Sequence, residues 1–334
     1  MKRYSRKKFN TLTTAFLLLA LLLAACTNIG ASDHSNEKVS SPTTASESKT
    51  KSTSPSPSTR EFTDSEGNQV QVPVNPQRIV LNSNRYGDLK IFDVPIVGLD
   101  KRYYDKTIFP EVEQLEDIGF PINLEKTLSL TPDLIMLGDV MNDKEYDNLS
   151  KIAPTITYDY TLSIADTVRN FGKLLGKEQI AERWITSYEQ KAKNSWNKLR
   201  QDGVIGKSET ATALVFFGNK KWYVMGSAGI TSTLYHPLGF KPAPKVQEVI
   251  DAGQAYPEVS AELLHEYVGD RLFVLTNVDK SGQAELETFM KSPIWTSIPA
   301  VKNGKMVRVD YKWNYDDATT ANLLLDELPN MLIK

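Results

Sequence analysis

The stretch IADTVRNFGKLLGKEQIAERWITSYEQKAKNSWNKLR, residues 164–200, decides the fold of this chain. Its apolar residues recur every three or four positions, which is the spacing of one face of an α-helix. Gly176 marks a break in this pattern. The helix that starts at Glu178 has about 23 residues and spans roughly 35 Å at 1.5 Å per residue. We therefore expect one long, rigid helix with a folded part of the chain on either side.

Short β-like runs alternate with helical stretches on both sides of this helix. Such alternation is typical of a parallel sheet with helices on its faces. The fold class that we expect is therefore α/β, with two Rossmann-like lobes that have central sheets and are joined by a single long rigid α-helix. The predicted strands are 77–81, 95–99, 133–137, 155–158, 211–217, 222–225, 271–276 and 306–309, and 318–332 is predicted as a closing helix.

The first 25 residues are typical of a secretory signal peptide, because a basic segment precedes an uncharged apolar run. The run 15–23 is much shorter than the roughly 20 residues that span a bilayer. It ends in Leu-Ala-Ala-Cys, which resembles the lipobox of bacterial lipoproteins, and Cys26 is the only cysteine. A lone cysteine in an apolar stretch can also be a simple small hydrophobe. We expect removal of 1–25, lipidation of Cys26 and a place on the extracytoplasmic face of the cell membrane, in a Gram-positive type of bacterium.

Residues 26–59 form a low-complexity tether, in which 16 of the 33 residues after Cys26 are Ser or Thr. Such a composition cannot bury enough apolar surface to fold. The remaining 275 residues, Arg60 to Lys334, exceed the usual size of one compact core. We divide them into an N-terminal lobe (60–163), linking helices (164–203) and a C-terminal lobe (204–334).

Composition and motifs exclude several classes of function. Without the five basic residues of the signal segment, 34 Lys and Arg face 41 Asp and Glu, a net charge near −7 that lacks the basic footprint of a nucleic-acid binder. The sequence contains no Gly-x-Ser-x-Gly nucleophile elbow, no His-Glu-x-x-His zinc-binding motif and no Gly-x-Gly-x-x-Gly dinucleotide-binding motif. Residues 203–208, GVIGKS, place two residues between the glycines where a phosphate loop needs four. Only His236 and His265 lie outside the tether, too few for a metal cage of side chains.

Several motifs, taken in order, resemble the substrate-binding lipoproteins of iron-siderophore ABC transporters, the class III binding proteins. The resemblance covers nearly the whole chain and implies lobes joined by one rigid helix, with no catalysis. A lipoprotein enzyme is the less favoured alternative. The matching segments are the lipobox, Phe62-Thr63-Asp64 to Val72-Pro73, Asn75-Pro76-Gln77-Arg78-Ile79-Val80, Asn123-Leu124-Glu125-Lys126, Leu130-Thr131-Pro132-Asp133-Leu134-Ile135, Leu234-Tyr235-His236-Pro237-Leu238-Gly239-Phe240, and Trp295 to Ala300-Val301-Lys302-Asn303-Gly304.

The resemblance implies two partners besides the ligand: a membrane permease and a separate ATPase. In this family one surface glutamate on each lobe docks onto permease arginines. Glu125 falls on the first position, and Glu262 is favoured for the second, with Glu258 as the alternative. Glu262 also suits a first helical turn after a Ser260 cap, whatever its function. We expect the protein itself to be a monomer.

The resemblance further implies a ligand site between the lobes for an iron(III)-siderophore complex. Its iron is already chelated, so we expect no cofactor and no metal ligand from the protein. The site needs aromatic side chains to cover the apolar faces of the complex, and hydrogen-bond donors or cations for its iron-chelating oxygens. For each aromatic candidate, packing in the protein core is the alternative. The candidates are Arg85, Tyr86, Arg102, Tyr103, Tyr104, Tyr160, Trp222, Tyr223, Trp313 and Tyr315.

One departure from the family bears on the class of siderophore. Hydroxamate-binding relatives place an arginine in the loop where this chain has Gly226 to Ile230. Arg85, Arg102 or Lys312 would have to replace it. Catecholate complexes carry more negative charge and call for a denser cationic cluster. A hydroxamate or mixed carboxylate siderophore is therefore favoured, while heme, a corrinoid or a free metal remain alternatives on the same fold.

Overall fold

The computed structural model describes residues 58–138 and 143–333. The predicted signal peptide, Cys26 and nearly all of the tether lie outside these residues. These described residues belong to one compact unit. Within its described part, no helix is long and apolar enough to cross a membrane.

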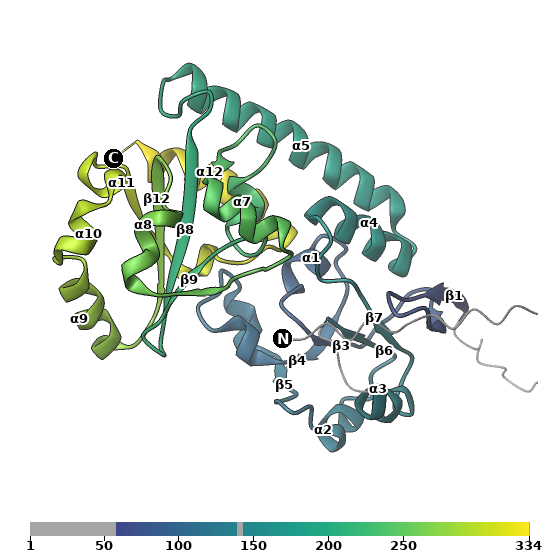
Figure 1. Cartoon of the computed structure of the whole chain (residues 1–334). Helices are drawn as coiled ribbons and strands as arrows, with labels where there is room; N and C mark the ends of the chain where they lie inside the picture. Colours follow the sequence, from purple (N-terminus) through teal and green to yellow (C-terminus); the bar gives the residue numbers. More distant parts are fainter. Residues whose placement is uncertain (1–57, 139–142, 334) are drawn as a thin grey trace, which may run out of the picture. The chain divides into compact units, whose positions relative to one another are not determined.

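The N-terminal lobe is built on a parallel sheet of five strands in the order β5-β4-β3-β6-β7. The two central strands read IVLN and LIML and are buried along their whole length, as expected for a sheet covered on both faces. Helices α2 (Leu124–Ser129) and α3 (Asp143–Ser150) lie beside this sheet (Figure 1). The strands are β3 (Ile79–Asn82), β4 (Ile96–Leu99), β5 (Glu116–Asp117), β6 (Leu134–Leu137) and β7 (Thr155–Thr157).

An antiparallel hairpin, β1 (Thr59–Thr63) and β2 (Gln69–Pro73), precedes this sheet. Asp64 ties the hairpin to the sheet, because its Oδ2 accepts hydrogen bonds from the backbone N (3.0 Å) and the hydroxyl (2.9 Å) of Thr157. The hairpin was not predicted from the sequence, and its first strand begins inside the range assigned to the tether.

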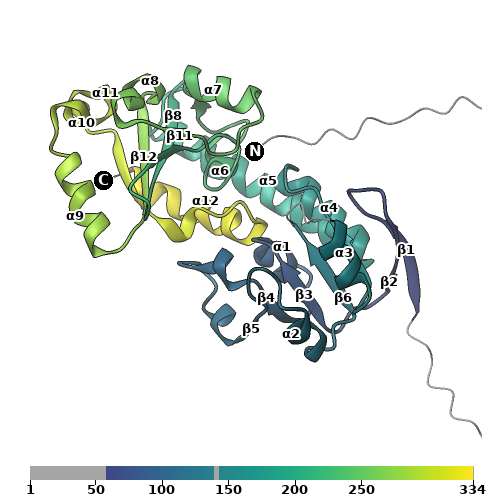
Figure 2. The ribbon, with the colours of Figure 1, turned by 60° about the horizontal axis from the view of Figure 1, so that its bottom comes forward.

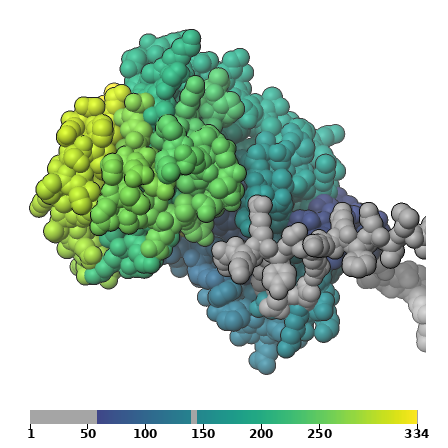
Figure 3. All heavy atoms as spheres, in the orientation of Figure 1, coloured from purple at the N-terminus to yellow at the C-terminus, as the bar shows by residue number. Residues whose placement is uncertain are grey.

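Two helices follow the first lobe: α4 (Ile164–Leu175) and α5 (Glu178–Gln201). Ser163 caps α4 by accepting a hydrogen bond from the backbone N of Asp166, and Gly176 ends it with a φ of +64°. Glycine adopts this left-handed conformation at little cost. The predicted break at Gly176 and the long helix after it are therefore confirmed. One flank of α5 is exposed and forms a continuous band of the surface (Figure 3, teal).

The C-terminal lobe has a sheet of six strands in the order β11-β9-β8-β12-β13, with β10 also paired to β8. β8, β12 and β13 are parallel, whereas β9 runs antiparallel to β8 because a tight turn at 218–221 joins them. The sheet is thus mixed, where a parallel sheet was expected. The strands are β8 (Thr210–Phe217), β9 (Trp222–Val224), β10 (Lys241–Pro242), β11 (Glu258–Val259), β12 (Arg271–Asn277) and β13 (Met306–Asp310).

Short helices complete the two lobes. In the N-terminal lobe they are α1 (Tyr86–Lys90) and the 3-10 helices η1 (Lys101–Tyr104) and η2 (Pro110–Gln114). In the C-terminal lobe they are α6 (Thr231–Leu234), α7 (Pro244–Asp251), η3 (Ala261–Leu263), α8 (Leu264–Tyr267), α9 (Lys280–Phe289), α10 (Pro293–Ser297), α11 (Pro299–Lys302) and η4 (Tyr311–Trp313).

The last helix, α12 (Ala318–Leu332), contacts both lobes. It packs along α5 and α6 and also reaches α1 of the first lobe and the linking helix α4 (Figure 2, yellow). The expected two-lobed α/β fold with a long connecting helix is confirmed, and α12 adds a second element that bridges the lobes.

The central strands alternate their side chains between two apolar clusters. In β8, Ala213 and Val215 enter one cluster, while Leu214 and Phe216 enter another. The first of these clusters is shared: it also contains Ile79 and residues of α4, α5 and α12. The two lobes therefore bury part of their apolar surface in one continuous core.

Candidate functional site at the junction of the lobes

The segments that follow the parallel strands of the two lobes meet directly. The hydroxyl of Tyr315 donates to the backbone O of Asp105 (2.9 Å), and Lys106 Nζ donates to the backbone O of Val278 (3.5 Å). Carboxyl ends of parallel strands are where open α/β sheets place their binding sites. We call residues 83–88, 100–106, 158–160 and 311–320 the interlobe junction.

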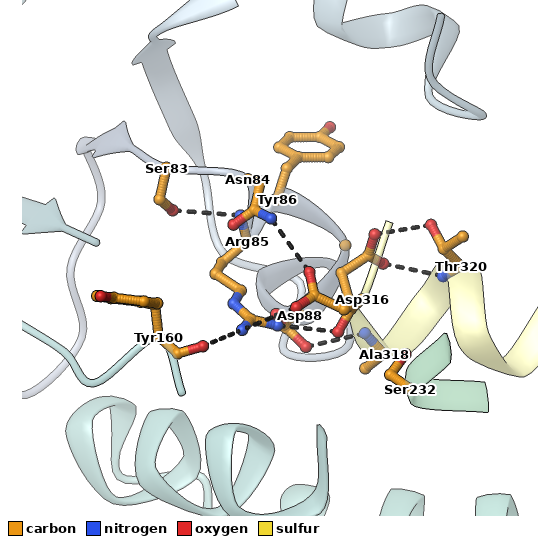
Figure 4. A network of polar contacts seen from close by, with 12 residues as sticks. Ser83, Asn84, Arg85, Tyr86, Asp88, Tyr160, Ser232, Asp316, Ala318 and Thr320 are labelled. Carbon is orange, nitrogen blue, oxygen red and sulfur yellow. Dashed lines mark hydrogen bonds and ion pairs between the residues drawn. The ribbon is translucent and has the colours of Figure 1, made fainter. Parts of the chain in front are cut away.

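Arg85 lies inside this junction and is only 1% exposed. Its Nη1 donates to the backbone O of Asp316 (2.9 Å), and its Nη2 donates to the backbone O of Tyr160 (3.1 Å) (Figure 4). The guanidinium also pairs with the carboxylates of Asp316 (3.5 Å) and Asp88 (3.6 Å). The hydrogen bonds of Arg85 therefore join the lobes to each other, and its contact with the ligand stays a prediction.

The carboxyl groups of Asp88, Asp316 and Asp317 all interact electrostatically with the guanidinium of Arg85. Asp88 and Asp317 are fully buried, and Asp88 Oδ1 accepts a hydrogen bond from the backbone N of Ala318 (2.9 Å). Burial raises the pKa of Asp88 to about 8, although Arg85 acts to lower it. Burial also raises the pKa of Asp317 to about 6, against hydrogen bonds from Thr320. Burial would lower the pKa of Arg85, but the nearby Asp316 and Asp88 raise it above its usual range.

Three predicted aromatic contacts are buried in the junction. The hydroxyl of Tyr104, a residue that is 3% exposed, donates to the backbone O of Ser83 (2.6 Å) and accepts from the backbone N of Tyr86 (3.0 Å). The ring of Tyr315 stacks on that of Tyr104, with centroids 6.4 Å apart. Tyr86 and Tyr315 are buried as well. Core packing, the alternative given for each aromatic, therefore holds for Tyr86, Tyr104 and Tyr315, since Tyr104 packs against Tyr86 within its lobe and stacks on Tyr315 of the other lobe.

Trp222 is also a core residue and not a contact for ligand. It is 4% exposed and stacks on Trp295 at 5.3 Å, within the second apolar cluster of the C-terminal lobe. Its prediction as a ligand contact is wrong because inward-facing positions of β9 cannot be told from outward-facing ones by residue type alone.

One group of accessible side chains in the N-terminal lobe surrounds Arg102, and a further exposed ring belongs to Tyr160. Its Nε donates to Asp100 Oδ2 (2.6 Å), and its Nη2 donates to the hydroxyl of Tyr103 (3.2 Å). Its guanidinium carbon lies 3.2 Å from the ring centre of Phe120, a residue that is 60% exposed. Tyr160 is 53% exposed. The structure thus keeps Arg102, Tyr103 and Tyr160 as candidates and adds Phe120, which follows a two-residue strand that the sequence did not reveal.

A second group of aromatic rings belongs to the C-terminal lobe. Tyr223 contacts Phe217 (5.1 Å between ring centres) and Tyr256 (6.5 Å), and Phe217 contacts Tyr311 (5.8 Å). Tyr256 is exposed and the other three are partly buried. Trp313 is partly buried, with Lys312 Nζ at 5.6 Å from its ring centre. Tyr223 and Trp313 were predicted from the sequence, whereas Phe217, Tyr256 and Tyr311 were not.

The three candidate docking glutamates lie on the surface. Glu125 occupies the first turn of α2, where Leu128 is also exposed. Glu262 lies in η3 and is exposed. Glu258 is exposed too, but it forms an ion pair with Lys221 (2.8 Å). The geometry therefore leaves Glu125 and Glu262 as the first choices for a docking role.

Acidic and histidine side chains of the described residues form no group of three or more that could hold a metal ion. Residues 110–312 match the family model described as periplasmic binding protein. The chain belongs to this family. This periplasmic binding protein is 30% identical over 335 residues to the iron(3+)-hydroxamate-binding protein YxeB of Bacillus subtilis strain 168, covering 98% of each chain.

Solved structures of similar proteins share its fold. The FhuD protein of Staphylococcus pseudintermedius superposes with a TM-score of 0.71 at 26% identity, over 82% of this chain and 98% of that one. FhuD2 of Staphylococcus aureus with bound ferrioxamine B gives a TM-score of 0.67 at 26% identity, over 77% and 98%. The resemblance to siderophore-binding proteins of ABC transporters is confirmed. These relatives are binding proteins and not enzymes, and so is this periplasmic binding protein.

Proposed function

We propose that this protein captures a ferric hydroxamate siderophore at the open side of the interlobe junction. The observation that carries the proposal is the exposed stack of Arg102 on Phe120, beside Tyr103. Aromatic faces suit the apolar body of an organic chelate, and a fixed guanidinium suits its chelating oxygens. The rings of Tyr223, Phe217 and Tyr311 offer a matching apolar surface on the other lobe.

The pairing of charges favours a ligand with little net charge. The cation Arg102 is matched by Asp100, and Lys312 Nζ lies 3.9 Å from an oxygen of Asp310. Arg85 is buried among carboxylates and does not face solvent. Three hydroxamates balance the charge of iron(III), whereas tris-catecholate complexes are strongly anionic and would need unpaired cations. The names of the hydroxamate-binding relative and of the ferrioxamine complex support the same choice.

The iron arrives already chelated, so the protein supplies no metal ligand and no cofactor. Binding of the chelate therefore involves no chemical reaction. The protein acts as a monomer, held on the extracytoplasmic face of the cell membrane by lipid at Cys26, and hands its cargo to a permease driven by a separate ATPase. Glu125 and Glu262 dock onto permease arginines, because carboxylates pair bidentately with guanidinium groups.

Tryptophan fluorescence of the purified full-length chain, titrated with chelates of each class, tests this function. Ferric hydroxamates are compared with ferric catecholate, ferric citrate, heme, a corrinoid and zinc, and with the iron-free hydroxamate as control. We expect saturable quenching at submicromolar concentration by a ferric hydroxamate alone. Quenching only by heme, corrinoid or zinc would refute the siderophore, and a catecholate response would refute the charge argument.

A further inference from the structure

The two lobes are fastened together by a cluster of polar groups at the N-terminal ends of α1 and α12. The cluster consists of Asn84, Arg85, Gly87, Asp88, Asp316, Asp317 and Thr319, and we call it the latch. Its residues come from segments more than 200 positions apart in the sequence. None of them was assigned a role in joining the lobes from the sequence.

The latch combines several bonds that each cross from one lobe to the other. Arg85 Nη1 donates to the backbone O of Asp316, and Asn84 Nδ2 donates to Asp316 Oδ1 (3.1 Å). The backbone N of Ala318 donates to Asp88 Oδ1, and the hydroxyl of Thr319 donates to the backbone O of Gly87 (2.6 Å). Buried hydrogen bonds are costly to break without a substitute partner.

Gly87 shows how closely the two helices approach. A Cβ atom at this position would lie 1.7 Å from Asp317 Oδ1 and 2.7 Å from Phe109 Cζ. Asp317 cannot swing aside freely, because its carboxylate caps α12 by accepting from the backbone N (2.9 Å) and the hydroxyl (2.7 Å) of Thr320. A side chain at residue 87 therefore has to push α12 away from α1.

The latch also reaches the candidate ligand surface. Arg85 Nη2 donates to the backbone O of Tyr160, whose ring is exposed. A single buried guanidinium thus links α1, the segment before α4 and the segment before α12.

We propose that the latch fixes the separation of the lobes before any ligand binds, with Arg85 and Gly87 as positioning residues. The aperture between the lobes is then a property of the ligand-free fold, and ligand binding selects an opening that already exists. This proposal does not depend on the identity of the ligand.

Interlobe distances measured by double electron-electron resonance on the ligand-free protein test the proposal. Spin labels replace Glu113 in the N-terminal lobe and Lys302 in the C-terminal lobe, both exposed, in a full-length chain that carries Cys26→Ser. The parent should give one narrow distance distribution. Gly87→Ala and Arg85→Gln should shift and broaden it, while Arg85→Lys should restore part of the sharpness.

Two matched controls separate the latch from general damage. Gly218→Ala adds the same methyl group where the nearest atom is at 3.7 Å, and Arg169→Gln removes an arginine whose partners, Asp166 and Glu182, lie in the linking helices. Both should keep the parent distribution. Should Arg85→Gln fail to fold, Thr319→Val provides a milder test, because Thr319 is partly exposed and the substitution removes only its hydrogen bond to Gly87. This variant by itself should broaden the distance distribution. Folded Gly87→Ala and Thr319→Val variants with the parent distribution would overturn the proposal.

Discussion

The guanidinium of Arg102 lies 3.2 Å from the ring centre of Phe120, and Asp100 holds it there through a 2.6 Å hydrogen bond to Nε. Phe120 stays exposed although it is a large apolar residue. An exposed aromatic ring that carries a fixed cation is a surface suited to an apolar ligand with oxygen acceptors.

Replacing Phe120 with alanine should weaken binding of a ferric hydroxamate roughly fivefold, since the ring face offered to the chelate is lost and Arg102 loses the ring that positions it, an effect of about 1 kcal/mol. Isothermal titration calorimetry measures the change. Leu128→Ala, which removes another exposed apolar side chain of the same lobe, serves as the control. Equal affinity in Phe120→Ala and the parent would remove Phe120 from the site.

Replacing Asp100 with asparagine should change which chelate is preferred. The variant keeps the shape of the side chain but removes the charge that balances Arg102. We expect the ratio of ferric citrate affinity to ferric hydroxamate affinity to rise, because one negative charge beside Arg102 no longer repels an anionic complex. A competition titration gives the ratio directly, and an unchanged ratio would contradict the role of Arg102.

Stability should fall as the pH rises from 7 to 9. Burial raises the pKa of Asp88 to about 8, above its value in the unfolded chain. The folded protein therefore holds a proton that the unfolded chain has lost, and this contribution disappears as pH passes through 8, by about 1 kcal/mol. Asp316, Asp317 and Arg85 face the same group.

Urea unfolding at several pH values measures this slope. Asp88→Asn removes the titrating group and should flatten the slope between pH 7 and 9. Asp270→Asn should leave the slope unchanged, because hydrogen bonds from Thr210 lower the pKa of Asp270 and keep it ionised throughout. An identical slope in the parent and in Asp88→Asn would show that the proton resides elsewhere.

Uptake of radioactive iron by whole cells tests the docking glutamates. The double variant Glu125→Ala/Glu262→Ala should lower uptake by at least about tenfold, since a hydrogen bond to a charged group contributes roughly 1.5–3 kcal/mol. Its affinity for the chelate should match that of the parent. The exposed pair Glu61→Ala/Glu66→Ala provides the control. A loss of affinity for the chelate in the docking variant would contradict the docking role of these glutamates.

Much of the fold could be predicted because its signals are local. Each of the eight predicted strands lies within two residues of an observed one, and Gly176 ends α4 where the helical pattern breaks. The β1-β2 hairpin was missed because its strands are only five residues long, and half of their residues are exposed. The antiparallel course of β9 follows from a turn whose geometry the residue types do not show.

The candidate site was harder to predict because burial there depends on distant partners. Arg85, Tyr104 and Tyr315 follow strands or precede a helix, as ligand contacts do, yet each is covered by a segment from the other lobe. Phe120 and Tyr256 escaped notice because no adjacent strand was recognised. Tyr103 and Tyr160 stay candidates, and the sequence pointed to them because their loops follow clear strands.

The contact between α1 and α12 also has a consequence for how the chain is made. The partners of residues 84–88 are synthesised more than 200 residues later, at Asp316 to Thr319. A polypeptide that emerges N-terminus first therefore cannot complete these contacts of its first lobe until residue 319 has emerged. The order of the sequence thus delays the final packing of the N-terminal lobe until the C-terminal lobe is present.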